Sequence, residues 1–187
     1  MDAVPIEPDT KDWTWVVHRP CDECGFDAAA VPRHLVSERI RENAQAWREV
    51  LAGDPELVRA RPSNDRWSAL EYGCHVRDVF LRFRERLTLM LTEDDPTFAN
   101  WDQDRTAIEG RYHDQDPAEV AAELLYAARK LADAFDVVTG PQWQRTGGRS
   151  DGARFTVESF ARYLLHDPVH HLHDVRTGLA RVQSTDR

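Results

Sequence analysis

The sequence has 187 residues, of which 41% are hydrophobic and 30% are charged, and its formal net charge is −9. These values are typical of one globular domain with a sizeable core. The acidic balance argues against nucleic acids and anionic membranes as partners, because both bind basic surfaces. No apolar run approaches the roughly 20 residues that cross a bilayer, so we expect no membrane segment.

The N-terminal stretch is acidic and lacks the apolar run of a secretory signal. Three cysteines, an odd number, do not make a disulfide framework. We therefore expect a cytoplasmic protein that acts on a small molecule.

Residues 1–30 are predicted to form an irregular arm, because prolines and a glycine interrupt any regular period. Trp13 and Trp15 are large apolar side chains within this arm, so we expect the arm to pack onto the body. Residues 31–180 are predicted to form the folded domain, and residues 181–187 a tail.

Four segments of the domain have the three- and four-residue apolar spacing of amphipathic helices. The second has the best start signal, because Ser68 and Glu71 form a capping box. The third begins with an aspartate followed by proline at the first helical position. The expected helices run from near Pro32 to Gly53, from Ser68 to about Thr92, from Asp116 to Gly140, and from Thr156 to Gly178.

Residues 94–115 form a polar connection that is longer than most helix–helix links, so we expect it to be functional or to contain a short helix. No segment shows the alternation of a strand. The sequence therefore predicts an all-α protein, a four-helix bundle with an irregular N-terminal arm.

Histidines on two of the expected helices point to a metal site. His166 and His170 are four residues apart and share a helix face, and His75 lies on the core stripe of the second helix. A buried ring nitrogen needs a partner, and a divalent ion held by all three imidazoles would supply one. Three ligands leave a coordination position open.

Carboxylates near these histidines are candidates to orient the imidazole rings from outside the metal. They are Asp78, Asp167 and Asp174. Asp102 and Asp104, in the long connection, are expected at the mouth of the site. His171 and His173 point elsewhere around the helix and are expected at the surface or lining a pocket.

The simpler interpretations stay open at this point. His75 alone fits a core histidine bonded to a backbone carbonyl, and His166 with His170 fits an ordinary helix face. Pro168, between the two histidines, is expected to kink the helix. The kink would either tune the distance between the rings or be a tolerated bend.

Cys21 and Cys24 have the spacing of half a zinc knuckle, but a closed site needs two more ligands. Cys74, His18 and His34 are weak candidates for those ligands. We interpret Cys21 and Cys24 as a reduced pair in a turn, and Cys74 as a small buried hydrophobe.

The residues Trp67-Ser68-Ala69-Leu70-Glu71, followed by His75 and by the pair His166/His170, resemble the DinB/YfiT-like superfamily of metal-binding four-helix bundles. Within it the sequence is most similar to the actinobacterial branch of mycothiol-dependent maleylpyruvate isomerase and related thiol transferases. The resemblance implies three histidine ligands for a divalent ion, with zinc as the first choice and nickel or iron as alternatives. It also implies a homodimer as one arrangement of the chain. The family usually has glutamate where this chain has Asp167.

The resemblance implies a metal-dependent thiol S-transferase or isomerase. The ion would activate a low-molecular-weight thiol, such as mycothiol, to attack a small electrophile. Arg82, Arg149 or Arg162 would hold an anionic group of the substrate. The alternatives are a non-catalytic metal- or ligand-binding bundle and a metal-dependent hydrolase.

Overall fold

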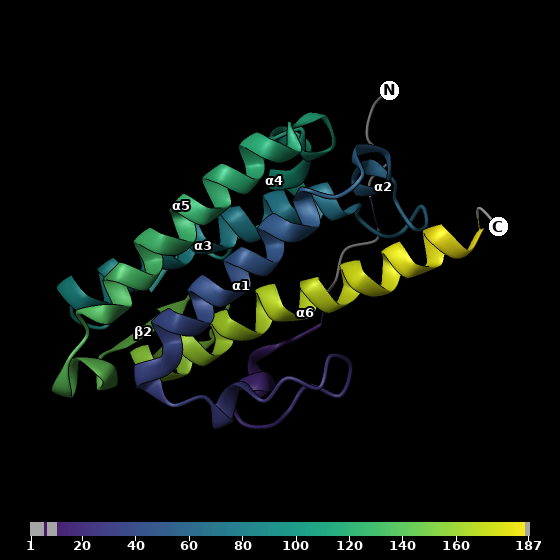
Figure 1. Ribbon diagram of the computed structural model, residues 1–187. Helices are drawn as coiled ribbons and strands as arrows, with labels where there is room; N and C mark the ends of the chain where they lie inside the picture. Colours follow the sequence, from purple (N-terminus) through teal and green to yellow (C-terminus); the bar gives the residue numbers. More distant parts are fainter. Residues whose placement is uncertain (1–5, 7–10, 186–187) are drawn as a thin grey trace.

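A computed structural model describes residue 6 and residues 11–185, with side chains described as far as Ala180. The predicted arm (residues 1–30) and tail (residues 181–187) therefore lie partly outside the described residues. The four expected helices are α1 (Val36–Leu51), α3 (Ala69–Thr92), α5 (Pro117–Asp136) and α6 (Val157–Thr185), and they form a four-helix bundle (Figure 1). The predicted fold class is confirmed.

Two shorter helices lie in the connections, α2 (Pro55–Arg59) and α4 (Gln103–Glu109). The second falls within the long polar connection, where the sequence predicted either a short helix or a functional segment. Asp102 begins α4, because its carboxylate accepts a hydrogen bond from the backbone N–H of Arg105 at 2.9 Å.

The core of the bundle forms where α5 packs against α1 and α3, while α6 packs against α3 and α1. Apolar residues at helical spacing supply it, as the sequence predicted. The indole of Trp47 in α1 is completely buried and donates a hydrogen bond to the backbone carbonyl of Pro168 at 3.1 Å. This contact ties α1 to the middle of α6. The largest fully buried apolar side chains include Trp47, Phe80, Phe160, Leu70, Leu87, Leu124, Leu131 and Leu164.

The expectation of no strands is wrong. A three-stranded sheet closes one end of the bundle, with β1 (Thr97–Phe98) parallel to β2 (Thr146–Arg149) and β2 antiparallel to β3 (Arg154–Thr156). These strands have only two to four residues. Such short segments do not display a period of two, so the sequence pattern could not reveal them.

The N-terminal arm packs along α6, as expected from its tryptophans (Figure 1). Its 3-10 turn Thr14–Val17 buries Val16 and Val17, and Ala28 is also buried. The arm therefore forms a layer over one face of α6.

The start of α3 is fixed by a buried ion pair in addition to the capping box. Glu71 accepts from the backbone N–H of Ser68 at 2.9 Å and from Nε of Arg61 at 2.9 Å. Burial alone would raise the pKa of Glu71, but Arg61 and the Ser68 N–H outweigh it and lower that pKa below its usual value.

We expect Glu71→Gln to lower the free energy of unfolding at pH 7 by about 1.5–3 kcal/mol, because a charged hydrogen-bond acceptor is lost. A carboxylate with a lowered folded pKa stabilises the fold above its unfolded pKa and loses this effect as the pH falls through the folded value. The difference between variant and wild type should therefore shrink below about pH 4.5. Urea unfolding at several pH values measures it.

Glu42→Gln is the matched control, because Glu42 pairs with Arg39 at the surface. Its effect at pH 7 should stay within about 1 kcal/mol. Equal effects of the two substitutions would contradict the role assigned to the buried pair.

Candidate metal centre

Helix α6 carries two pairs of potential ligands in neighbouring registers. His166 and His170 are four residues apart, and so are Asp167 and His171. Because each residue turns a helix by about 100°, the two pairs face two directions. Among the described residues, the side chains within ligand distance of one another form two sets of three or more. The open set is His75, Asp167 and His171, and the arm set is Cys21, Cys24, His166 and His170.

The open set joins α3 to α6. Oδ1 of Asp167 lies 3.5 Å from Nε2 of His75 and 3.8 Å from Nε2 of His171. Two ligands bound to one tetrahedral ion at about 2.0–2.1 Å would be roughly 3.3 Å apart. The observed distances therefore fit side chains that surround one small cation.

The polar atoms of the open set also indicate a missing partner. The side chain of His75 is completely buried, and neither of its ring nitrogens has a hydrogen-bond partner among the described residues. Within the same part of the chain, Oδ1 of Asp167 is shielded from solvent and also has no hydrogen-bond partner. Buried polar groups without partners are rare and costly. A divalent cation bound by these atoms would satisfy them, so the residues present fit a metal.

Aromatic rings enclose His75 on several sides. Trp101 is stacked on it with ring centroids 5.3 Å apart and planes at 6°, and Trp67 lies at 5.4 Å. Trp101 is held in place by a hydrogen bond from its Nε1 to Oγ1 of Thr106 at 2.7 Å. The long connection between α3 and α5, which contains α4, thus covers His75.

A pocket of about 980 Å³ is lined by Asp167 and His171 of the open set and by His166 and His170 of the arm set. Its walls come from the N-terminal arm, the connection around Trp101, the β2–β3 turn and α6. Asp102 and Asp104 line it, as predicted for the mouth of a site. Of the three candidate arginines, Arg149 lines the pocket and donates to the hydroxyl of Tyr163 at 3.2 Å.

The other two arginines are engaged elsewhere. Arg162 forms an ion pair with Glu158 at 3.0 Å, and Arg82 pairs with Glu85 at 3.5 Å and lies over the ring of Trp101. Of the three arginines, only Arg149 lines the pocket.

The charge states of the open set suit cation binding. Burial alone would raise the pKa of Asp167, but His171 and His75 beside it lower that pKa well below its usual value. Asp174 behaves in the same way, since burial opposes ionisation and His171 outweighs it. Its Oδ2 lies 3.6 Å from Nδ1 of His171. Asp174 is therefore placed to orient His171, as predicted for a carboxylate outside the ligand set.

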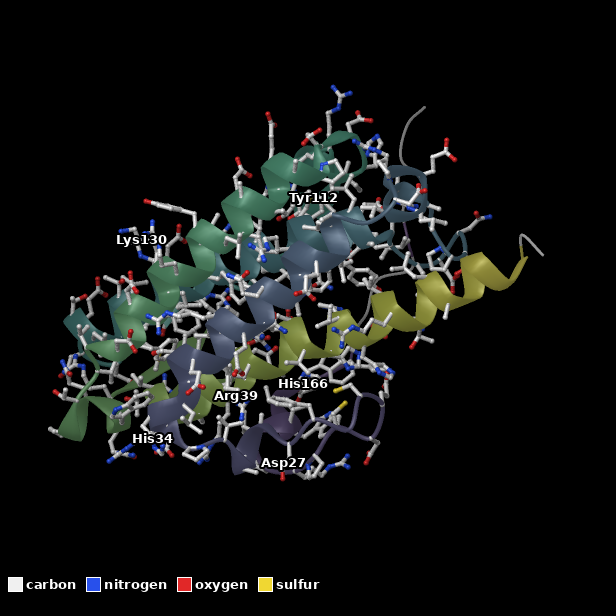
Figure 2. All side chains as sticks on the ribbon, viewed as in Figure 1. Asp27, His34, Arg39, Tyr112, Lys130 and His166 are labelled. Atoms are coloured by element: carbon white, nitrogen blue, oxygen red, sulfur yellow. The ribbon has the colours of Figure 1, made fainter. Side chains whose placement is uncertain are left out.

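The arm set lies on the adjacent face of α6. Figure 2 shows His166 beside the N-terminal arm, with yellow sulfur atoms close to its label. Trp13 of the arm packs against His166 and His170, with ring centroids 5.3 and 4.8 Å away. Burial lowers the pKa of His166 to about 4, helped by His170, and lowers the pKa of His170 as well. Both imidazoles are thus neutral at pH 7, which is the form that binds metals.

The structure does not gather His75, His166 and His170 into one set. His166 and His170 are neighbours with ring centroids 5.0 Å apart, whereas His75 lies with Asp167 and His171. Asp167, expected outside the ligands, is therefore a candidate ligand itself. The sequence signal for Asp167 and His171 was their four-residue spacing, which is the spacing of His166 and His170 shifted by one residue.

Three other predicted residues are placed as follows. Asp78 accepts hydrogen bonds from the Tyr112 hydroxyl at 2.6 Å and from Nε of Arg77 at 2.8 Å, and no contact of it with a histidine is seen in the described part of the chain. His173 is exposed, as expected. Helix α6 continues through Pro168. The backbone carbonyl of Pro168 accepts a hydrogen bond from the indole of Trp47.

A family model for the DinB superfamily matches residues 37–175. The chain belongs to the DinB superfamily. The matched range contains α3 and α5, all of α1 after Val36, and residues 157–175 of α6. Both faces of α6 that carry ligands lie within it, whereas Cys21 and Cys24 lie before it.

Among solved structures, the DinB fold of this chain is similar to YfiT from Bacillus subtilis, with a TM-score of 0.72 and 18% identity over 81% of this chain and 87% of that one. YfiT is described as "a probable metal-dependent hydrolase with an unusual four-helix bundle topology". No curated protein matches the chain. None of the described helices is long and apolar enough to cross a membrane.

We expect His171→Ala to weaken metal binding at the open set at least about 100-fold, because it removes a direct ligand. His173→Ala is the matched control, since this exposed histidine lies two residues further along the same helix. Isothermal titration of metal-free protein with zinc measures both. Unchanged affinity in His171→Ala would exclude His171 as a ligand.

Proposed function

We propose that this DinB protein is a metal-dependent S-transferase or isomerase that activates a low-molecular-weight thiol at the open set. The observation that carries the proposal is the arrangement of His75, Asp167 and His171, which offers three ligands and faces a pocket of about 980 Å³. Three protein ligands with an open position are typical of catalytic rather than structural sites.

A divalent ion at the open set would lower the pKa of a thiol that coordinates it, so that the thiolate is present at neutral pH. Zinc is the first candidate, because two imidazoles and a carboxylate are among its usual ligands. His75 and Asp167 lie where they would bind such an ion from inside the bundle. Asp174 would keep His171 in the tautomer that leaves Nε2 free for the metal.

The pocket walls suit a polar thiol. The connection contributes Asn100, Asp102, Gln103 and Asp104, whose side chains are hydrogen-bond partners for hydroxyl groups. A thiol that carries sugar hydroxyls, as mycothiol does, would match this lining. Such a thiol is kept reduced in the cytoplasm, where we place the activity.

Arg149 is the candidate to bind an anionic group of the electrophile. Its side chain is mostly shielded from solvent and already pairs with Asp151 at 2.8 Å. Burial opposes its charge, but Asp151 outweighs burial and raises the pKa of Arg149. The fixed guanidinium would orient a carboxylate by paired hydrogen bonds.

Hydrolysis is the second candidate reaction. Two imidazoles and a carboxylate also activate water in hydrolases, and the similar YfiT fold is described as that of a probable hydrolase. Pro168, which the sequence predicted to kink the helix, does not interrupt α6.

The two reactions can be separated with one protein preparation. Zinc-loaded protein is incubated with monochlorobimane and one thiol at a time (mycothiol, cysteine or glutathione), and separately with a panel of esters and amides without thiol. We expect fluorescent thioether only when metal and a polar thiol are both present. Turnover of the esters or amides alone would favour the hydrolase, and no turnover in either assay would favour a binding protein.

We expect Asp167→Asn to lower kcat/KM for the thiol reaction at least about 100-fold, which corresponds to about 2.7 kcal/mol of transition-state stabilisation. His34→Ala, at an exposed histidine labelled in Figure 2, is the control and should leave the rate unchanged. Initial rates at several thiol concentrations measure both. A wild-type rate in Asp167→Asn would contradict the proposed role of the open set.

A further inference from the structure

We infer that the arm set is a second metal site, a closed structural zinc site formed by Cys21, Cys24, His166 and His170. It joins the N-terminal arm to α6, and it is independent of the proposed function of the open set. Two thiolates and two imidazoles in tetrahedral arrangement are a typical structural zinc site.

The distances support four ligands around one ion. One potential ligand atom from each of the four side chains lies within 4.8 Å of all the others. Sγ of Cys21 lies 3.7 Å from Nδ1 of His170. Bonds of about 2.3 Å to sulfur and 2.0–2.1 Å to nitrogen place such atoms roughly 3.6 Å apart in a tetrahedron.

Three of the four side chains are buried, and one of their nitrogens has no partner. Cys21, His166 and His170 are 1%, 3% and 6% exposed, whereas Cys24 is half-buried. Nε2 of His166 is shielded from solvent and has no hydrogen bond in the described structure. A zinc ion bound by this nitrogen would satisfy it.

The backbone of the arm presents both sulfurs to one side. The N–H of Cys21 donates to the carbonyl of Phe26 at 3.0 Å, and the N–H of Gly25 donates to the carbonyl of Cys21 at 2.8 Å. Gly25 has φ = +74°, a conformation that glycine adopts without strain. This turn has the shape and spacing expected of a zinc knuckle.

Carboxylates lie on the outer side of His170. Its Nε2 is 3.6 Å from Oδ2 of Asp174 and 3.8 Å from Oε2 of Glu23. These groups favour a proton on Nε2, which leaves Nδ1 free to bind zinc beside Cys21. The carboxylate of Asp174 also lies beside His171, so it is shared between the two sites.

Four protein ligands leave no position for substrate, so the arm set would act structurally. Its effect on the pocket would be indirect. Lys11, Asp12, Trp13 and Thr14 form one wall of the pocket beside the open set. Zinc at the arm set would hold this part of the arm against α6 and so maintain that wall.

Metal content separates the two sites. Protein purified under reducing conditions should contain two zinc ions per chain by elemental analysis. We expect Cys21→Ser/Cys24→Ser to contain one, and His75→Ala also one, whereas Cys74→Ala, which removes the cysteine outside the arm set, keeps two. Loss of all zinc from any one variant would indicate a single shared ion and overturn the proposal. Unchanged zinc in the double-cysteine variant would also overturn it.

Cobalt gives a readout that does not depend on activity. Cobalt bound by thiolates has an intense sulfur-to-metal charge-transfer band in the near ultraviolet. This band should appear in wild-type protein and in His75→Ala, and be absent from Cys21→Ser/Cys24→Ser. Its absence from the wild type would overturn the proposal, even if the thiol reaction of the open set is found.

A measurement on the wild type covers the case in which the double-cysteine variant does not fold. Titration with a mercurial reagent should release one zinc ion as two thiols react. Trypsin cleavage after Lys11 should then accelerate about tenfold, because the released arm opens more often. Reaction of the thiols without zinc release would contradict a zinc site, and a disulfide between Cys21 and Cys24 under reducing conditions would exclude it.

Discussion

The site depends on one helix that carries ligands on two adjacent faces. In α6, the pair at residues 166 and 170 and the pair at residues 167 and 171 differ in direction by about one residue's rotation. One pair faces the N-terminal arm, and the other faces α3 across the bundle. Asp174 follows both pairs by one turn and contacts a histidine of each. The position of α6 therefore determines both groups of ligands at once.

The buried imidazoles of His75 and His166 need a polar partner in the core. His75 is completely buried among aromatic rings, and its nitrogens have no hydrogen-bond partner among the described residues. A buried imidazole without partners would destabilise the fold, and a bound cation would make it a stabilising ligand. The same reasoning applies to His166. Metal binding at these atoms would therefore be coupled to folding.

The irregular segments cover the candidate site and form walls of its pocket. The connection around Trp101 covers His75, and the N-terminal arm and the β2–β3 turn form other walls of the pocket. Helices supply precise ligand positions, whereas loops supply the surfaces that select a substrate. The helices hold most of the candidate metal ligands, and the loops would decide which small molecule enters the pocket.

The sequence by itself determined the four helices, because apolar spacing and caps such as Ser68 with Glu71 are local signals. It also determined the family, and it identified His75, His166 and His170 as inward-facing residues. The short strands could not be recognised, since two to four residues show no period. Only the tertiary structure decided which ligands meet. The pairs 166/170 and 167/171 of α6 have the same spacing in the sequence. Their partners, the Cys21–Cys24 turn and His75, lie about 145 and 90 residues away along the chain. The rotation of α6 relative to α3 and the arm determines which of these side chains lie close together. This rotation depends on packing across the whole core.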